Sequence, residues 1–452
     1  MRGERCRPQV AQSGSDQHFL SIGLNQAEQK LRTALFVVST WKPCMMADMQ
    51  RARQIAAHMP AHGWSVEILA PDNSFQTDVS AIQGDGIAFP DVLVHSVPPW
   101  HPRAFERLGS RNIGIRASVP VRRLGARLCR ERKYDMVYFT TTQHWLTCQG
   151  ANWRRATGVP YVADLHDPVY LEKKTYFISR HRLKERFAKH LGKTIERLAL
   201  ARADGIVSVS QGYIDDVARR NPSARWLRRG TTLVEPFPAD LDALASATPR
   251  VRAGGARKRV VYIGAGGNIM EKGWLEFVAC LQECERQSLP SIELHGTDTD
   301  WRANKRRYLQ GAAEEAGLWG VVEESPARIS YTDSLSLVKG ADALLVLGVD
   351  DPNYRPSKLQ TYLATGLPVL VLAHAASPLI HALATCGPGI HCLRFGDDGL
   401  RAANRRVVSD FLSALRTGKH WSRGERSILA PDHSAAHHAG LFNRIVESAR
   451  SQ

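Results

Sequence analysis

Short apolar runs alternate along the chain with longer amphipathic segments, and the alternation forms two series. In the first series, apolar runs of strand length lie at residues 31–39, 64–71, 134–140, 159–165 and 205–210. Helical patterns separate these runs. The clearest pattern places apolar residues at Leu183, Phe187, Leu191, Ile195 and Leu198, and this spacing keeps them on one helix face. The series predicts strands that alternate with helices.

A second series follows a stretch, residues 231–255, that is rich in proline, ends in two glycines and has few large apolar residues. We interpret this stretch as an interdomain linker. The strands predicted after it lie at 259–264, 291–296, 341–349, 367–373 and 389–395. Two successive series of this kind predict an α/β protein with two parallel, doubly wound sheets. A ligand site is then expected in the cleft between the domains, beyond the carboxyl ends of the strands.

These patterns divide the chain into five parts. We expect a flexible tail at 1–30, an N-terminal domain at 31–235, a linker at 236–257, a C-terminal domain at 258–430 and a final helix at 431–452.

Composition and charge narrow the function classes. The chain has 452 residues, with 60 Lys and Arg against 44 Asp and Glu, so its formal net charge of +16 favours anionic partners. No apolar run is long enough to span a membrane, and no secretory signal is expected at the N-terminus. The eight cysteines form no CxxC pair, which indicates reduced thiols in a cytosolic protein rather than a disulfide framework or zinc site.

The first motif is YIGAGGNIMEKG at 262–273, which joins a strand to a helix. Its glycines Gly264, Gly266 and Gly267 let the backbone approach a phosphate, and Lys272 adds a positive charge. Ile269 takes the third glycine position of the dinucleotide fingerprint, and the Walker pattern also fails. The motif predicts a phosphate loop, with a tight strand-to-helix turn as the alternative.

The second motif is YRPSKLQTYLATGLPVLVLA at 354–373. Its first proline, Pro356, and its glycine, Gly366, are placed to begin and end a helix. Ser357, Lys358 and Thr361 would then lie on the first turns of that helix, facing the cleft. Lys358 can neutralise a phosphate there, and the two hydroxyls can bind a ribose. An ordinary helix with a solvated lysine is the alternative reading.

The third motif is VADLHDPVY at 162–170, where Asp164, His166 and Asp167 follow a buried strand. Such a group can orient a hydroxyl, act as a base or cap the next element. The three residues lie too close in sequence to show the spacing of metal ligands, so no metal site is predicted.

Together and in this order, the three motifs resemble those of the family 4-like retaining glycosyltransferases of the GT-B fold, most closely the bacterial surface-polysaccharide type. ADLHDP is similar to the family's DxRDPW segment, YIGAGGNIMEKG to its donor phosphate loop, and PSKLQTYLATGLPVL to its PSKxxEYLAxGxPVL motif. The resemblance spans roughly residues 31–415. It implies two Rossmann-like domains facing across a cleft, the N-terminal domain for the acceptor and the C-terminal domain for the nucleotide-sugar.

The resemblance also implies roles for individual residues. His166 and Asp167 would face the acceptor as the catalytic residues. The donor would be held by Gly264, Gly266, Gly267, Lys272, Ser357, Lys358 and Thr361. Lysines and backbone amides would meet the diphosphate charge, so we expect a metal-independent enzyme without a cofactor, the nucleotide-sugar being its substrate.

Two departures from the family pattern keep other functions open. Asn353 and Thr361 stand where the family often has two glutamates, and the loop at 41–49 lacks the usual glycines. The alternatives are a non-catalytic GT-B partner or scaffold protein and a sugar-nucleotide epimerase of the same fold. A Rossmann oxidoreductase is disfavoured by Ile269.

Two basic stretches suggest where the protein acts. Residues 101–133 and 173–202 each hold ten Lys or Arg against two glutamates, and both lie in the predicted acceptor domain. We expect them to dock on anionic headgroups, at about 1 kcal/mol per nearby cation. The prediction is a cytoplasmic protein, peripheral to the inner membrane face, with a lipid-linked or saccharide acceptor. Nucleic acid is disfavoured, because the stretches lack aromatics at a stacking spacing.

Overall fold

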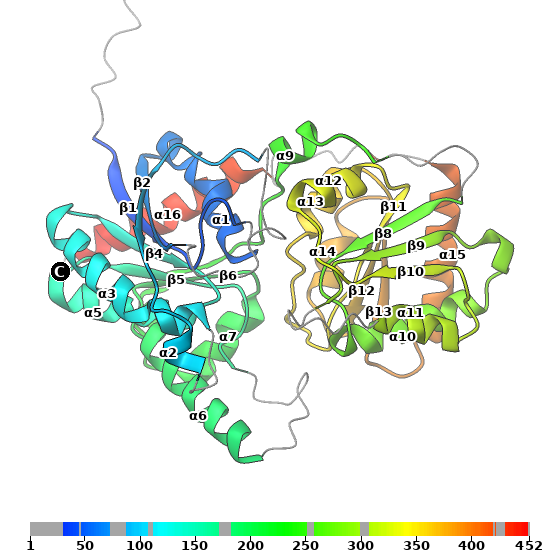
Figure 1. Cartoon of the computed structure of the whole chain (residues 1–452), viewed down its shortest axis with the longest axis horizontal. Helices are drawn as coiled ribbons and strands as arrows, with labels where there is room; N and C mark the ends of the chain where they lie inside the picture. Colours follow the sequence, from blue (N-terminus) through cyan, green and yellow to red (C-terminus); the bar gives the residue numbers. More distant parts are fainter. Residues whose placement is uncertain are drawn as a thin grey trace, which may run out of the picture.

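The computed structural model describes residues 30–44, 47–72, 87–106, 112–170, 182–250, 257–298, 307–418, 421 and 430–450. These residues form two α/β domains that lie side by side (Figure 1). Apart from Lys30, the predicted tail falls outside the described residues.

The N-terminal domain is built on a seven-stranded parallel sheet with the order β3-β2-β1-β4-β5-β6-β7. Its strands are β1 (Arg32–Val37), β2 (Trp64–Pro71), β3 (Leu93–Val97), β4 (Met136–Thr140), β5 (Tyr161–Leu165), β6 (Gly205–Ser208) and β7 (Thr232–Val234). Its helices are α1 (Ala47–Ala56), η1 (Met59–His62), α2 (Arg103–Glu106), α3 (Ile113–Glu131), α4 (His144–Thr147), α5 (Gln149–Thr157), α6 (Arg182–Ala199), α7 (Gln211–Arg220) and α8 (Arg225–Arg229). The strand order reverses direction between β1 and β4.

The C-terminal domain is built on a six-stranded parallel sheet with the order β10-β9-β8-β11-β12-β13. Its strands are β8 (Arg259–Ile263), β9 (Ser291–His295), β10 (Val322–Ser325), β11 (Ala343–Val346), β12 (Val369–His374) and β13 (Ile390–Phe395). The helices of this part are α9 (Leu241–Ser246), η2 (Asn268–Met270), α10 (Glu271–Gln282), η3 (Arg286–Ser288), α11 (Tyr308–Glu315), α12 (Tyr331–Lys339), α13 (Leu359–Ala364), α14 (Leu379–Ala384) and α15 (Arg401–Thr417).

Helices cover both faces of each sheet, which explains why the central strands are apolar without alternation. Every residue of β4, β5, β8 and β11 is buried. One face of the N-terminal sheet packs against α3 and α5, and the other against α1 and the last helix, α16 (Pro431–Arg450). The prediction of two doubly wound parallel sheets is confirmed.

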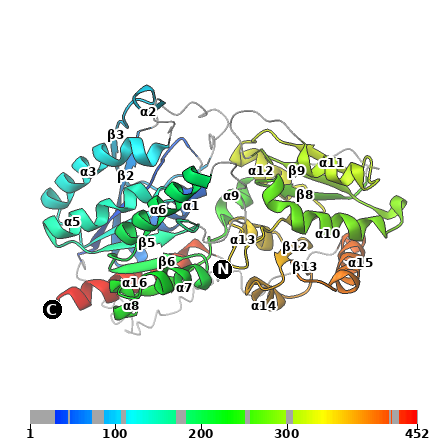
Figure 2. The same ribbon diagram turned by 90° about the horizontal axis from the view of Figure 1, so that it is seen from below.

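Helix α16 belongs in space to the N-terminal domain, although it follows the C-terminal domain in sequence (Figures 1 and 2). Its Leu441, Phe442 and Ile445 are fully buried in the same apolar cluster as Phe36 of β1. The chain therefore crosses between the domains twice, once in the linker and once before α16.

Several elements differ from the sequence-based expectation. Strands β3, β7 and β10 were not predicted. β3 and β7 are partly exposed edge strands, and β10 carries two glutamates, so none has the apolar run of a buried strand. Helix α9 lies inside the stretch predicted as linker, where Ala243 and Leu244 pack against the C-terminal core.

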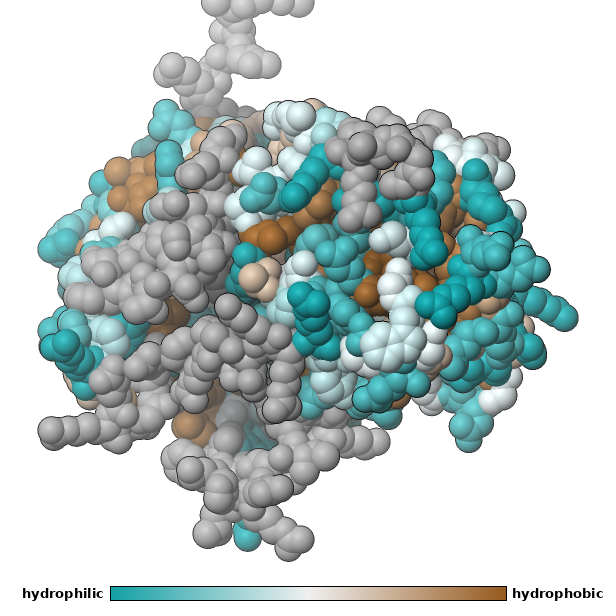
Figure 3. Space-filling view, turned by 45° about the vertical axis from the view of Figure 1, so that its right-hand side comes forward, coloured by the Kyte–Doolittle hydropathy of each residue, from teal (hydrophilic) through white to brown (hydrophobic). Residues whose placement is uncertain are grey.

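The described surface is mostly hydrophilic in the view of Figure 3, and hydrophobic residues appear there as small separate patches. Single exposed hydrophobic residues are normal on a folded protein. Within the described residues, no helix is long and apolar enough to cross a membrane.

Candidate active site between the domains

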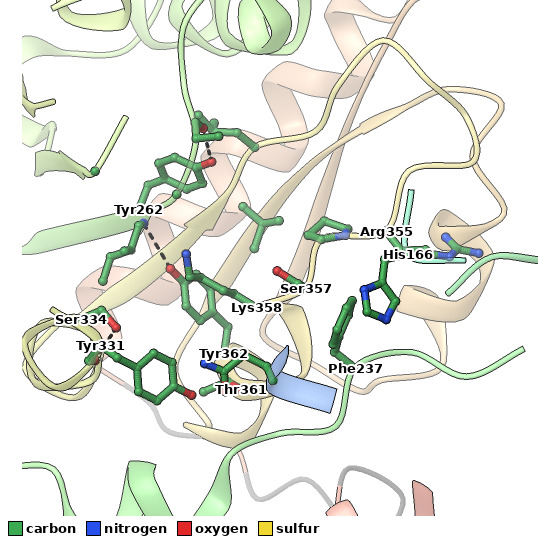
Figure 4. A pocket seen from close by; sticks show the side chains of 18 of the residues that line it. His166, Phe237, Tyr262, Tyr331, Ser334, Arg355, Ser357, Lys358, Thr361 and Tyr362 are labelled. Atoms are coloured by element: carbon green, nitrogen blue, oxygen red, sulfur yellow. Dashed lines mark hydrogen bonds between the residues drawn. The ribbon is translucent and has the colours of Figure 1, made fainter. Parts of the chain in front are cut away.

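A cavity of about 510 Å³ opens between the two domains, at the carboxyl ends of both sheets (Figure 4). The N-terminal domain lines it with Gln50 and Gln54 of α1 and with His166 and Asp167, which follow β5. The C-terminal domain lines it with the turn after β8, with residues 328–334 and with residues 354–362. Its volume is in the range of small-molecule sites.

On the N-terminal side, a buried carboxylate fixes His166. His166 Nε2 lies 2.7 Å from Asp164 Oδ2, and both side chains are almost completely buried. A carboxylate oxygen only accepts hydrogen bonds, so Nε2 carries the hydrogen. In the neutral imidazole Nδ1 is then an acceptor. His166 Nδ1 is buried and has no hydrogen-bond partner among the described residues.

Asp164 is held by a network of buried groups. The same Oδ2 accepts from Tyr138 at 2.6 Å and from Thr140 at 3.0 Å, and it forms a 2.8 Å ion pair with Nε of Arg51. Burial alone would raise the pKa of Asp164, but Arg51, His166 and the Tyr138 hydroxyl together hold this pKa below its usual range. Asp164 is therefore an anion that keeps the ring of His166 in one orientation.

Arg51 also binds the linker between the domains. Its guanidinium donates to the carbonyls of Glu235 at 2.8 Å and Pro236 at 3.2 Å and lies 4.7 Å from the ring centre of Phe237. The Phe237 ring in turn contacts the His166 ring edge-on, with 4.9 Å between their centres. The linker is thus a wall of the cavity and packs directly on His166.

A second arginine of α1 binds the linker two residues further along the helix. Arg53 pairs with the buried Asp240, which also accepts a 2.8 Å hydrogen bond from Tyr331 of α12. This bridge connects the N-terminal domain, the linker and the C-terminal domain through one carboxylate.

Helix α16 reaches the same network through His438. Its Nδ1 donates to the Ser434 carbonyl at 2.7 Å, and its Nε2 lies 3.1 Å from the Tyr138 hydroxyl. Burial lowers the pKa of His438 to about 4, so the ring is neutral near pH 7. Its unprotonated Nε2 then competes with Asp164 for the single hydroxyl hydrogen of Tyr138. The linker and α16, which follows the second crossing between the domains, therefore both contact residues that bind Asp164.

On the C-terminal side, Lys358 lies at the cavity without an ionic partner. It precedes α13, is half-buried and forms no hydrogen bond or ion pair through Nζ in the part of the chain that the structure describes. Burial and the neighbouring Arg328 lower the pKa of Lys358 to about 8. Two neighbouring cations that form no ion pair among the described residues make a suitable site for an anion.

The other predicted residues of this motif also line the cavity. Ser357 is exposed there, and Thr361 is buried with its hydroxyl 3.4 Å from the backbone N–H of Asp240. The helix begins at Leu359 instead of at the proline, so Ser357 and Lys358 belong to the turn before it.

Some residues of the predicted phosphate loop line the cavity and others lie outside its lining. Gly264 lines the cavity, whereas Gly266 and Gly267 do not. A Cβ on Gly266 would lie 2.7 Å from Cβ of Thr297, so close packing of two turns requires glycine there. Lys272 is also absent from the lining and pairs with Asp350 at 2.5 Å. Its assignment to phosphate stays a prediction.

Asn353, the first departure from the family pattern, lies at a contact between the domains and not in the cavity lining. A Cβ on Gly212 of α7 would lie 1.9 Å from Asn353 Oδ1, so only glycine permits this approach. Beside it, Tyr213 of α7 donates to Asp351 at 3.1 Å.

Among the cavity residues that the sequence-based reading missed, Phe237, Arg328 and Arg355 matter most for the chemistry of the site. Arg355 directly precedes the PSK motif, and this position could have identified it as a site residue. Arg328 follows the strand β10, which was itself missed, and Phe237 was assigned to a linker. No group of three or more His, Cys, Asp or Glu among the described residues could hold a metal ion, and no disulfide joins the cysteines there.

A family model and solved structures are similar to this chain. Residues 49–229 match the model of the glycosyl transferase 4-like domain. No curated protein shows significant sequence similarity. Anabaena HepE, solved in complex with UDP, is 15% identical with a TM-score of 0.54, covering 93% of this chain and 100% of its own.

Two further structures have the same architecture. WaaG, described as a glycosyltransferase involved in lipopolysaccharide biosynthesis, is 17% identical with a TM-score of 0.53 and covers 89% of this chain and 98% of its own. The catalytic domain of starch synthase IV from Arabidopsis thaliana, bound to ADP and acarbose, is 11% identical with a TM-score of 0.59. The match covers 92% of this chain and 100% of the starch synthase chain. Identities this low show the fold alone, and the predicted GT-B architecture is confirmed.

Proposed function

Because the chain carries a glycosyl transferase 4-like domain and has the GT-B fold, we propose that it transfers a sugar from a nucleotide-sugar to an acceptor hydroxyl. The observation that carries the proposal is the position of Lys358. It lies at an interdomain cavity beside Arg328 and forms no ion pair among the described residues. A diphosphate satisfies two such cations, and HepE was solved with UDP.

The donor would occupy the C-terminal half of the cavity. Lys358 and Arg328 would bind its diphosphate, the turn at Gly264 would let the backbone approach it, and Thr361 would bind its ribose through a hydroxyl. Gly266, Gly267 and Lys272 would support the phosphate turn from outside the cavity lining, with Lys272 held by Asp350.

Transfer breaks the bond between the anomeric carbon and the phosphate oxygen and forms one from that carbon to the acceptor oxygen. The cations stabilise the leaving diphosphate, which carries away the electron pair. His166 Nδ1 can accept the acceptor's proton, and Asp167 lies next to it in the cavity lining. We propose that transfer proceeds with retention and without a metal ion.

The acceptor and the location of the reaction rest on the basic surface of the N-terminal domain. Arg122, Arg123, Arg127 and Arg130 are all exposed on α3. An anionic membrane surface is the partner that fits this charge, and a lipid-linked or saccharide acceptor in surface polysaccharide synthesis fits a protein on that surface. We place it in the cytoplasm, at the inner membrane face.

A non-catalytic GT-B partner or scaffold protein is the second candidate. It is favoured by Asn353, which lies at a domain contact outside the cavity lining, and by Thr361, whose side chain is shorter than a glutamate. Such a protein would bind a nucleotide-sugar or a partner without turning it over.

A thermal-shift screen against UDP, GDP, dTDP and their sugars tests the proposal, because a ligand of the folded state raises the melting temperature. We expect one nucleotide series to raise it and the matching sugar donor to be consumed, also in the presence of EDTA. Binding without turnover over a panel of acceptors would favour the scaffold protein. No shift with any nucleotide would contradict both.

A further inference from the structure

Three cations line the cavity from the C-terminal domain, and the proposed diphosphate accounts for two of them. Lys358 and Arg328 lie within electrostatic reach of each other, because Arg328 contributes to the lowered pKa of Lys358. In the view of Figure 4, Arg355 lies away from Lys358, on the side of His166. A nucleoside diphosphate bound at the pair leaves Arg355 without an anion.

The burial of Arg355 without a partner should lower the stability of the protein. Its Nη1 is completely buried and donates no hydrogen bond, and no carboxylate among the described residues forms an ion pair with it. Burial lowers the pKa of Arg355, and the nearby Tyr213 of the N-terminal domain opposes this effect. A buried N–H of a charged group without an acceptor is destabilising, and such groups are rare unless a ligand completes them.

Arg355 lies toward the reacting end of the cavity. In the view of Figure 4, Arg355 and His166 lie toward one end, Tyr331 and Ser334 toward the other, and Lys358 between them. Two effects agree with this placement. Tyr354, the residue before Arg355, has its pKa raised by burial and by Asp167, and Tyr213 acts on Arg355 itself. The end that holds His166 is where the sugar would meet the acceptor.

We propose that Arg355 binds the carboxylate of an acidic sugar, a hexuronic acid, at the reacting end of the cavity. The planar fork of a guanidinium matches a carboxylate in a bidentate pair, which a lysine cannot do. The phosphate charge of the donor is met elsewhere, by Lys358 and Arg328. This inference rests on the proposed function and names its substrate class: the uronate is either the donor sugar or the acceptor sugar.

The donor arm compares nucleotide-sugars that differ only at C6, with UDP-glucuronate against UDP-glucose and GDP-mannuronate against GDP-mannose. Calorimetry is done on the wild type, on Arg355→Gln and on Arg406→Gln, which removes the same charge from an exposed site on α15. The acceptor arm compares transfer onto methyl glucuronide and methyl glucoside.

We expect the wild type to prefer the acidic sugar in one arm by about ten- to a hundredfold, the range for a lost charged hydrogen bond. Arg355→Gln should abolish that preference and leave the affinity for the bare nucleoside diphosphate unchanged. Arg406→Gln should behave like the wild type. The arm that responds identifies which sugar carries the carboxylate.

Two outcomes would overturn the inference while the proposed function stands. One is equal use of acidic and neutral sugars in both arms. The other is a loss in Arg355→Gln that is the same for acidic and neutral sugars and is reproduced by Asp167→Asn, since Arg355 would then pair with Asp167 when the domains close. If no nucleotide-sugar binds at all, the proposed function fails and this inference fails with it.

Discussion

The two walls of the interdomain cavity differ in whether their charged side chains form ion pairs. On the N-terminal wall, Asp164 is paired with Arg51 and His166, and Asp240 of the linker is paired with Arg53. On the C-terminal wall, Lys358, Arg328 and Arg355 form no ion pair within the described part of the chain. The N-terminal wall thus pairs its buried carboxylates Asp164 and Asp240 with arginines, and only Asp167 of its carboxylates in the cavity lining has no ion pair among the described residues, whereas the C-terminal wall presents cations to the cavity.

This difference separates groups that stabilise the folded site from groups that are available to bind a substrate. A buried ion pair that loses one partner leaves an uncompensated charge, so the N-terminal wall should be sensitive in stability. A buried cation without a partner already bears a desolvation cost, so its removal should affect binding and not stability. The N-terminal domain also has exposed cations, among them Arg122 and Arg123 of α3, but these do not line the cavity.

The largest effect is expected for Arg51→Met. Arg51 and Asp164 are completely buried, so the variant leaves a buried carboxylate with fewer partners and should lose about 3–5 kcal/mol of unfolding free energy. Urea unfolding followed by circular dichroism measures this. Lys358→Met is the contrasting variant, with no loss expected. Equal losses in the two variants would erase the distinction between the walls.

A smaller effect is expected on the outer surface. Reversing Arg123 and Arg127 to Glu should weaken sedimentation with anionic vesicles at low salt by about 2 kcal/mol or more, at about 1 kcal/mol per cation. The matched control reverses Arg406 and Arg416, which are exposed on α15 of the other domain. High salt should release the wild type, because screening acts over about 10 Å at 0.1 M. Binding that is equal for neutral vesicles, or equal in both double variants, would refute membrane docking by α3.

The smallest effect concerns pH. Because the pKa of Lys358 is lowered to about 8, its ammonium is charged below that pH and loses its proton above it. A bound diphosphate favours the charged form. The affinity for a nucleoside diphosphate should therefore be constant below pH 8 and fall by up to about tenfold per pH unit above it. Calorimetry between pH 6 and 10 measures the slope, and Lys358→Arg should remove it. An unchanged slope in that variant would assign it to another group.

Much of the fold could be predicted from the sequence because its central strands are buried on both faces. The apolar runs that became β5, β8 and β12 needed no tertiary information. β10 could not be found in the same way, because its sequence VEES carries two glutamates, one of which is buried and caps α11 through the backbone of Leu309 and Gln310. The position of α16 on the other domain also has no local signal.

The site was predictable where a motif marks the end of a strand. His166 and Asp167 after β5, Gly264 after β8 and the residues Ser357, Lys358 and Thr361 all line the cavity. What could not be predicted is pairing: Lys272 has the sequence context of a phosphate ligand, yet an aspartate 78 positions away is its partner. Arg328 and Arg355 look like any surface arginines until the fold places them at the cavity.

The most direct test of the account is the affinity of Lys358→Met for the nucleoside diphosphate that the wild type binds. We predict a loss of about 1.5–3 kcal/mol in binding free energy with no loss of unfolding free energy, because the lysine serves the ligand and not the fold. Arg406→Gln serves as the control for a lost positive charge. Wild-type affinity in Lys358→Met, or a loss that merely follows reduced stability, would contradict the claim that the C-terminal wall is a diphosphate site.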